Sequence, residues 1–243
     1  GILKHGITAI IGPQPEDALE VIERQAAKVG APLLVHGQHW HVSVEAERLI
    51  YQDETGLLDL PLPNLTGPHQ IQNAGATIAT LRYLGMDEIA CTAAISQANW
   101  PARMQRLRTG PLLKNLSRNE VWLDGGHNPA AGRAIAATLS SLAKRETHII
   151  CGMINTKDVK GFLAPISPHC KSLTTITIPN EPNAVSAPDL ANFGRSCGLT
   201  SFEGIDIEKA LQDLSKRHPE ARILICGSLY LAGHVLREND EKV

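Results

Sequence analysis

The amino-acid pattern that most constrains this chain is an alternation of short apolar runs with longer helical segments in its second half. The apolar runs span Val121 to Leu123, His148 to Cys151, Leu173 to Ile178 and Ile223 to Cys226. Runs of this length, separated by segments long enough for a helix, are typical of βαβ units, whose parallel strands are buried on both faces by crossover helices. The alternation therefore predicts an α/β fold with a doubly wound parallel sheet from about residue 101 onward.

The first part of the chain combines two other patterns. A short apolar run at residues 7–11, an amphipathic stretch at 16–29 and a second apolar run at 32–35 predict a strand, a helix and a parallel strand. Alternating apolar and polar residues over 39–62, with turn residues at 53–56, predict an antiparallel meander. The opening β/α unit is typical of one end of a larger sheet.

Two helices separate this part from the second half. Apolar residues recur at helical spacing over 70–84, and a second helical segment runs from 87 to about 98. Asn99-Trp100-Pro101 ends the second helix, because proline disfavours helical backbone at the residue before it. We therefore expect a boundary there, with one domain over residues 1–100 and the other over 101–243.

Charge and cysteine content exclude several classes of function. The 23 Lys and Arg nearly balance the 25 Asp and Glu, and a net charge of −2 gives no field that would attract nucleic acid or an anionic membrane surface. No apolar run reaches the roughly 18 residues of a membrane span. Five cysteines without a CxxC spacing indicate reduced thiols, and the scattered histidines lack metal-ligand spacing. We expect a cytoplasmic monomer that acts on small molecules, with no metal ligands in this chain.

The segment after the first apolar run of the second half has the sequence of a ligand-binding turn. Asp124 ends the strand, Gly125 and Gly126 follow, and His127 precedes Asn128-Pro129 at a helix start. Asp124 is therefore expected at the carboxyl end of a parallel strand, where open α/β sheets bind ligands and where a carboxylate can accept hydrogen bonds from ribose hydroxyls. The alternative, left open by the pattern, is that Asp124 caps a turn and His127 is a solvated loop residue.

Two further patterns are suited to nucleotide binding. Gln70 and Asn73 lie on one face of a predicted helix, and their amides could bind the edge of an adenine ring or simply cap the helix. Arg103, at the expected domain boundary, could bind a phosphate or remain a surface residue. Neither GxxxxGK[ST] nor GxGxxG occurs in the sequence, which disfavours a dehydrogenase and leaves no cradle for a triphosphate.

Five motifs in the same order resemble the folylpolyglutamate synthase/dihydrofolate synthase family of the Mur ligase superfamily. They are Gly67 to Ala74, Pro101 to Gln105, Asp124 to Pro129, Gly152 to Asp158 and Cys226 to Gly233. The resemblance implies the C-terminal part of a Mur-ligase-type central ATPase domain, followed by a complete Rossmann-like ligase domain. In the family, the phosphate loop, a carbamylated lysine, the magnesium ligands and the pterin-binding loop lie upstream of the matched region.

The resemblance also implies a reaction and roles for residues. The family uses ATP and Mg²⁺ to convert a folate or dihydropteroate carboxylate to an acyl phosphate, which the amine of L-glutamate attacks. By matching position, Asn73 would contact adenine with Gln70 supporting the base site, Arg103 would contact the nucleotide phosphates, and Asp124 the ribose. His127 would be the catalytic residue, facing the reacting groups and the incoming glutamate.

The sequence departs from the family at two points. Pro101-Ala102-Arg103 stands where the family usually has Pro-Gly-Arg, and the alanine adds strain if that position needs a positive φ. Asn183 stands where relatives commonly place an arginine, which leaves the specificity for glutamate open. The alternative function is a noncatalytic nucleotide-binding α/β module, and we expect the chain alone to be inactive.

Overall fold

The computed structural model describes residues 1–114, 116 and 118–240. Its internal contacts divide the chain into two compact units, Gly1–Asn99 and Trp100–Val243. None of the helices found in the described residues is both long and apolar enough to cross a membrane.

The first unit opens with a parallel β/α element, as predicted. Strand β1 (Ala9–Ile11) pairs in parallel with β2 (Leu33–Val35), and α1 (Glu16–Val29) connects them. The helix ends at Gly30, whose φ of 73° lies in the left-handed region and whose N–H donates to the carbonyl of Ala26 at 2.8 Å. The predicted end of this helix at residue 29 is therefore confirmed. Gly30 can end it because glycine adopts the left-handed conformation without a Cβ clash.

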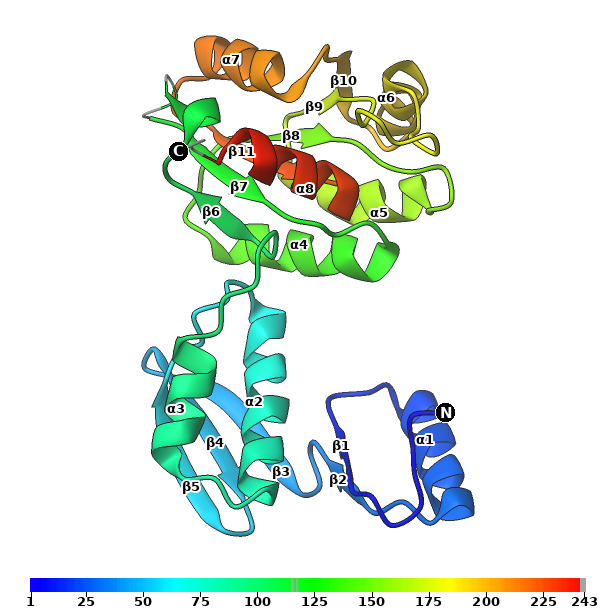
Figure 1. Ribbon diagram of the computed structural model, residues 1–243, viewed down its shortest axis with the longest axis vertical. Helices are drawn as coiled ribbons and strands as arrows, with labels where there is room; N and C mark the ends of the chain where they lie inside the picture. The colour runs from blue at the N-terminus through cyan, green and yellow to red at the C-terminus, as the bar shows by residue number, and fades with distance from the viewer. Residues whose placement is uncertain (115, 117, 241–243) are drawn as a thin grey trace. The chain divides into compact units, whose positions relative to one another are not determined.

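The rest of the first unit is an antiparallel meander covered by two helices (Figure 1). The strands are β3 (Trp40–Glu45), β4 (Arg48–Asp53) and β5 (Gly56–Pro61), and the helices are α2 (Pro68–Tyr83) and α3 (Glu88–Ser96). Large buried side chains from both layers form one core: Trp40, Leu49, Tyr51, Leu60, Ile78 and Ile95. The predicted meander and helix pair are thus present.

The second unit is built on a six-stranded sheet in the order β10-β9-β8-β11-β7-β6. The strands are β6 (Gln105–Leu107), β7 (Glu120–Leu123), β8 (Thr147–Cys151), β9 (Ser172–Thr175), β10 (Thr200–Glu203) and β11 (Arg222–Cys226). Every neighbouring pair is parallel except β6 and β7, which are antiparallel. The α/β prediction is confirmed, whereas the antiparallel edge β6 and the outer strand β10 were not predicted.

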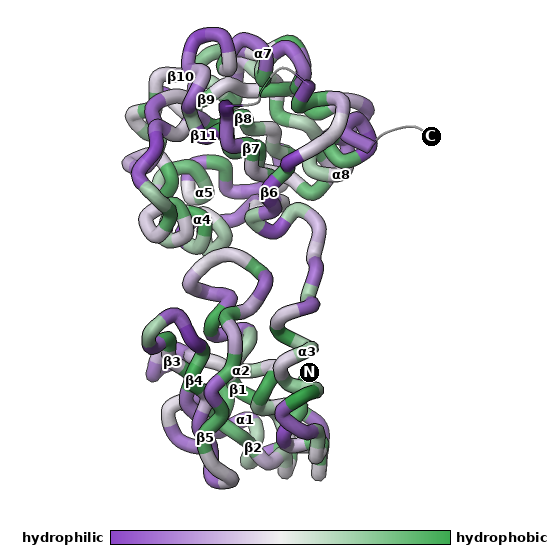
Figure 2. Tube along the Cα trace, turned by 90° about the vertical axis from the view of Figure 1, so that its left-hand side faces the viewer, coloured by the Kyte–Doolittle hydropathy of each residue, from purple (hydrophilic) through white to green (hydrophobic). Residues whose placement is uncertain are grey.

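Helices cover both faces of this sheet (Figure 1). One face packs against α4 (Pro129–Ser141), α5 (Val159–Ile166) and α6 (Ala187–Ser196), and the other against α7 (Ile207–Arg217) and α8 (Leu229–Glu238). Short 3₁₀ turns lie at Pro111–Leu113 and Ser167–His169. Helix α7 is hydrophilic apart from the residues that face the sheet (Figure 2).

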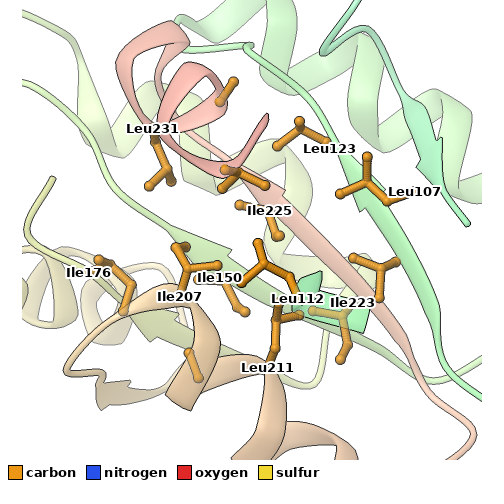
Figure 3. Packing of buried hydrophobic residues seen from close by; sticks show 14 of the residues in the cluster. Leu107, Leu112, Leu123, Ile150, Ile176, Ile207, Leu211, Ile223, Ile225 and Leu231 are labelled. Atoms are coloured by element: carbon orange, nitrogen blue, oxygen red, sulfur yellow. The ribbon is translucent and has the colours of Figure 1, made fainter. Parts of the chain in front are cut away.

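Successive strand residues point to opposite faces and fill two cores. Ile150 and Ile225 lie in the core that contains Leu211 of α7 and Leu231 of α8 (Figure 3). Their neighbours Ile149 and Leu224 lie in the other core, which contains residues of α4 and α5. Burial on both faces explains why these strands read as continuous apolar runs in the sequence.

Candidate functional site

The carboxyl ends of three adjacent strands form a backbone-lined edge. Strands β8 and β11 are each followed directly by glycine, at Gly152 and Gly227, and β7 is followed by Asp124 and then Gly125. The Gly227 N–H donates to the Gly126 carbonyl at 3.1 Å, and the Gly152 N–H donates to the Cys226 carbonyl at 3.3 Å. Because α4 and α8 leave β7 and β11 on opposite faces, this edge is a topological switch point, where α/β sheets bind ligands.

Asp124 lies at the end of β7 and is buried, with 4% of its surface exposed. Its Oδ1 accepts the backbone N–H of Gly126 at 2.6 Å, and its Oδ2 accepts the backbone N–H of Met104 at 2.8 Å. The predicted position at a parallel strand end is correct. The structure adds a role that the sequence did not indicate, because this carboxylate ties the turn after β7 to the segment before β6.

The segment before β6 has an unusual backbone. Ala102 has φ 55° and Met104 has φ 41°, both in the left-handed region that favours glycine. The Ala102 carbonyl accepts the Gly125 N–H at 2.8 Å, and the Ala102 N–H donates to Gln105 Oε1 at 2.8 Å. These hydrogen bonds hold Ala102 in a conformation that costs an alanine about 1 kcal/mol.

Arg103 lies between these two anchored residues. Ala102 and Met104 are buried, whereas Arg103 is exposed. Within the described part of the chain, no carboxylate forms an ion pair with the Arg103 guanidinium. A fixed backbone with an exposed, uncommitted guanidinium is suited to binding an anion.

His127 is half-buried at the start of α4. Its Nδ1 lies 3.0 Å from the Gly125 carbonyl oxygen, which can only accept, so Nδ1 carries the proton in the neutral ring. The Nε2 atom then carries the lone pair that can accept a hydrogen bond. Asn128 caps α4 by accepting the Ala131 N–H at 2.9 Å, with Pro129 in the first turn, as predicted.

Gln70 and Asn73 lie together near the start of α2, in the first unit. Gln70 is 4% exposed, and its Oε1 accepts a hydrogen bond from Asn73 Nδ2 at 2.9 Å. Its Nε2 lies 2.9 Å from His69 Nε2. Asn73 is exposed, so Gln70 fixes the orientation of an amide that retains groups for a ligand. Arg103, Asp124 and His127 belong to the second unit.

Comparisons with known proteins assign the chain to a family. The family described as "Dihydrofolate synthetase, C-terminal domain" matches residues 112–238. The dihydrofolate synthase/folylpolyglutamate synthase of Mycobacterium tuberculosis is 26% identical over 257 residues, covering 93% of this chain and 50% of that protein. The enzyme of the same name from Bacillus subtilis is 24% identical, covering 97% of this chain and 55% of that protein. The chain spans about half the length of the curated relatives it matches.

Solved structures match over nearly the whole chain. Escherichia coli FolC in complex with ADP has a TM-score of 0.80 at 26% identity, covering 98% of this chain and 54% of that one. E. coli FolC in complex with DHPP and ADP has a TM-score of 0.80 at 27% identity, with the same coverage. A bifunctional synthase with Mn, AMPPNP and L-glutamate bound has a TM-score of 0.78 at 25% identity, covering 98% of this chain and 54% of that one.

Proposed function

This chain belongs to the dihydrofolate synthetase C-terminal domain family, within the folylpolyglutamate synthase/dihydrofolate synthase group of Mur ligases, and from this premise we propose that its parent protein is an ATP-dependent ligase. The ligase would join L-glutamate to the carboxylate of a folate or dihydropteroate. We further propose that residues 1–100 are the C-terminal part of a central ATP-binding domain and that 101–243 are the ligase domain.

The observation that carries the proposal is the anchoring of Arg103 beside the end of β7. The Asp124 carboxylate accepts the Met104 N–H, and the Ala102 carbonyl accepts the Gly125 N–H, so the backbone on both sides of Arg103 is fixed. The Arg103 side chain is exposed. A guanidinium offers a planar set of donors that suits phosphate oxygens. We assign Arg103 to the phosphates of ATP.

We propose the remaining nucleotide contacts from the resemblance to the family. We assign Asn73 to the adenine, with its amide oriented by Gln70, and Asp124 to the ribose. The Asp124 carboxylate lies at the carboxyl end of a parallel strand, where open α/β sheets bind ligands, and a carboxylate accepts hydrogen bonds from hydroxyl donors. In this assignment, Asp124 would bind the ribose and also accept the backbone N–H groups of Met104 and Gly126.

The proposed reaction has two displacements. A substrate carboxylate oxygen attacks the γ-phosphorus of ATP, which forms an acyl phosphate and releases ADP. The glutamate nitrogen then attacks the acyl carbon, the C–O bond to phosphate breaks, and the nitrogen loses a proton. We assign His127 to this second step, because its Nε2 can accept a hydrogen bond from the amine while Nδ1 is held by the Gly125 carbonyl.

A magnesium ion, when bound, would neutralise charge on the transferring phosphoryl group. Across the described residues, the one group of three side chains with converging metal-ligand atoms is Glu146, His148 and His218. Two imidazoles do not suit Mg²⁺, which prefers oxygen ligands. We therefore assign magnesium to no residue of this chain and derive no step through it.

The proposal is tested by phosphate release from ATP by the parent protein. We expect release that requires both L-glutamate and either dihydropteroate or a reduced folate, with a product one glutamate larger by mass spectrometry. Comparison of the two acceptors separates dihydrofolate synthesis from polyglutamate extension. Nucleotide binding without turnover of either acceptor would instead favour a noncatalytic nucleotide-binding module.

A further inference from the structure

Three side chains of types that can bind a metal converge at the amino end of β8, the sheet edge opposite the turns described above. Glu146 precedes β8, His148 is its second residue, and His218 follows the last residue of α7. The Glu146 Oε1 atom lies 3.1 Å from His148 Nε2 and 3.4 Å from His218 Nδ1. All three ligand atoms lie within 4.8 Å of one another.

From this geometry we propose that Glu146, His148 and His218 form a binding site for one divalent transition-metal ion, with Zn²⁺ as the best-suited ion. Ligand atoms about 2.0–2.1 Å from a tetrahedral zinc lie roughly 3.4 Å apart, and both oxygen-to-nitrogen distances here are close to that value. Two imidazoles and one carboxylate leave the fourth position for water, which can reach the partly exposed Glu146 and His218.

The His148 imidazole is already oriented for a metal. Its side chain is buried, and its Nδ1 lies 2.7 Å from Ser172 Oγ on the neighbouring strand β9. A proton on Nδ1 can be donated to the hydroxyl, which leaves the Nε2 lone pair directed at the group. Metal-ligating histidines commonly hold their second ring nitrogen in this way. Burial and the nearby His218 keep the pKa of His148 below its usual value, which favours the neutral ring.

His218 is held by its backbone. The buried Asn119 side chain donates from Nδ2 to the His218 carbonyl at 2.9 Å and to the Ala221 carbonyl at 3.1 Å. The His218 ring also packs on the His148 ring, with centroids 4.0 Å apart. His218 caps the C-terminus of α7, where the negative end of the helix dipole favours a cation.

The arginines close to this group in the sequence are committed to other partners. Arg222 donates from Nε to Glu120 Oε2 at 3.0 Å, and Arg217 lies over the Phe202 ring at 5.3 Å from its centroid. In the portion of the chain that the structure describes, no Lys or Arg forms an ion pair with Glu146, whose carboxylate lies within 4.0 Å of the two imidazoles. The Glu146 carboxylate is therefore available to a metal.

The test is zinc binding to the whole chain, first freed of metal with a chelator and then titrated by calorimetry. We expect one Zn²⁺ per chain and a rise in Tm, because the ion binds a site that only the folded state assembles. Loss of one ligand in His218→Ala or Glu146→Gln should weaken binding by on the order of 100-fold, and Ser172→Ala by about tenfold. Mg²⁺, added as a second probe, should not compete.

The matched control is His234→Ala, because His234 Nε2 lies 3.1 Å from Glu238 Oε1 but has no third ligand beside it in the described residues. This variant should bind zinc like the wild type. Circular dichroism shows whether each variant is folded, and replacing the partly exposed His218 and Glu146 avoids disturbing the core. Zinc binding that persists in the double variant of His218 and Glu146, or no stoichiometric binding by the wild type, would overturn the proposal.

Discussion

The Met104 backbone N–H donates to Asp124 Oδ2 at 2.8 Å, which connects the segment that carries Arg103 to the carboxyl end of β7. The other Asp124 oxygen accepts the Gly126 N–H at 2.6 Å. One buried carboxylate therefore holds two neighbouring turns together, because the start of antiparallel β6 lies beside the end of β7. Both turns contain residues that we assign to substrate binding.

Replacing Asp124 with asparagine tests how much these two hydrogen bonds stabilise the fold. An amide has one accepting oxygen, so its NH₂ would face a backbone N–H, and one buried donor would lose its partner. We expect Asp124→Asn to lower the free energy of unfolding by about 1–3 kcal/mol, measured by urea denaturation. The control is Asp158→Asn, at the exposed N-cap of α5, where asparagine caps equally well and the change should stay below about 0.5 kcal/mol. Equal changes in the free energy of unfolding of the two variants would show that the Asp124 carboxylate does not stabilise these two turns.

Replacing Arg103 with alanine tests its proposed contact with the nucleotide. In the parent protein, Arg103→Ala should weaken ATP use by about 1.5–3 kcal/mol, the scale of a hydrogen bond to a charged group, without lowering Tm, because the side chain is exposed. The measurement is the kcat/KM for ATP. Arg108→Ala, an exposed arginine on the same segment beyond β6, should leave this value unchanged. Unaltered ATP kinetics in Arg103→Ala would remove the arginine from the site.

The pH dependence of stability should depend on Asp53. Burial alone raises the pKa of this carboxyl, but hydrogen bonds from Thr55 and Arg82 outweigh it, so the pKa is lowered on folding. The stability from Asp53 is therefore complete above its unfolded pKa of about 3.9 and is lost as the pH falls through the lower folded value. Unfolding free energies measured from pH 7 down to pH 3 should show this loss in the wild type and a smaller one in Asp53→Asn.

At neutral pH, Asp53→Asn should destabilise the first unit by about 2–3 kcal/mol. Asp53 and Arg82 form a bidentate ion pair at 2.7 and 2.9 Å, and the substitution leaves a mostly buried guanidinium unpaired. Asp59→Asn is the matched control, because its ion pair with Arg48 is exposed and should contribute less than about 1 kcal/mol. A cost as small as that of Asp59→Asn would show that burial adds nothing to the Asp53 pair.

Gly227 should not tolerate a side chain. Its φ is 110°, and a Cβ there would lie 2.6 Å from Cys151 Sγ and 2.7 Å from the Gly152 carbonyl oxygen. We expect Gly227→Ala to cost about 2–4 kcal/mol from backbone strain and overpacking together. Both variants are compared by thermal unfolding. Gly85→Ala measures backbone strain without overpacking, because Gly85 has φ 75° with open space around it, and should cost about 1 kcal/mol. Similar losses of Tm would mean that the strand-end turn has room to adjust.

The sequence predicted the elements whose pattern is set by burial. Strands β7, β8 and β11 are buried on both faces and read as apolar runs, and the N-cap pattern at Asn128 located α4. Strand β10 was missed because it is an outer strand with mostly exposed residues. Strand β6 was missed because two of its three residues, Gln105 and Arg106, are polar, so it forms no apolar run.

Parts of the site are also outside what sequence spacing can indicate. The partner of Asp124 is a backbone N–H, at Met104, and every non-proline residue carries one, so nothing in the letter sequence marks it. Glu146 and His148 meet His218 because α7 returns to the start of β8, a relation of topology and not of spacing. The roles of Gln70, Asn73, Arg103, Asp124 and His127 toward substrates stay predictions.

The position of β11 has a consequence for how the second unit is made. This strand follows all its sheet partners in the chain, yet it pairs with both β7 and β8 at the centre of the sheet. During synthesis, β7 with β6 and β8 with β9 and β10 therefore present two unpaired edges until residues 222–226 leave the ribosome. Unpaired edges promote aggregation. A nascent chain interrupted before Arg222 would consist of two half-sheets without the strand that joins them, and should depend on chaperones more than its finished form does.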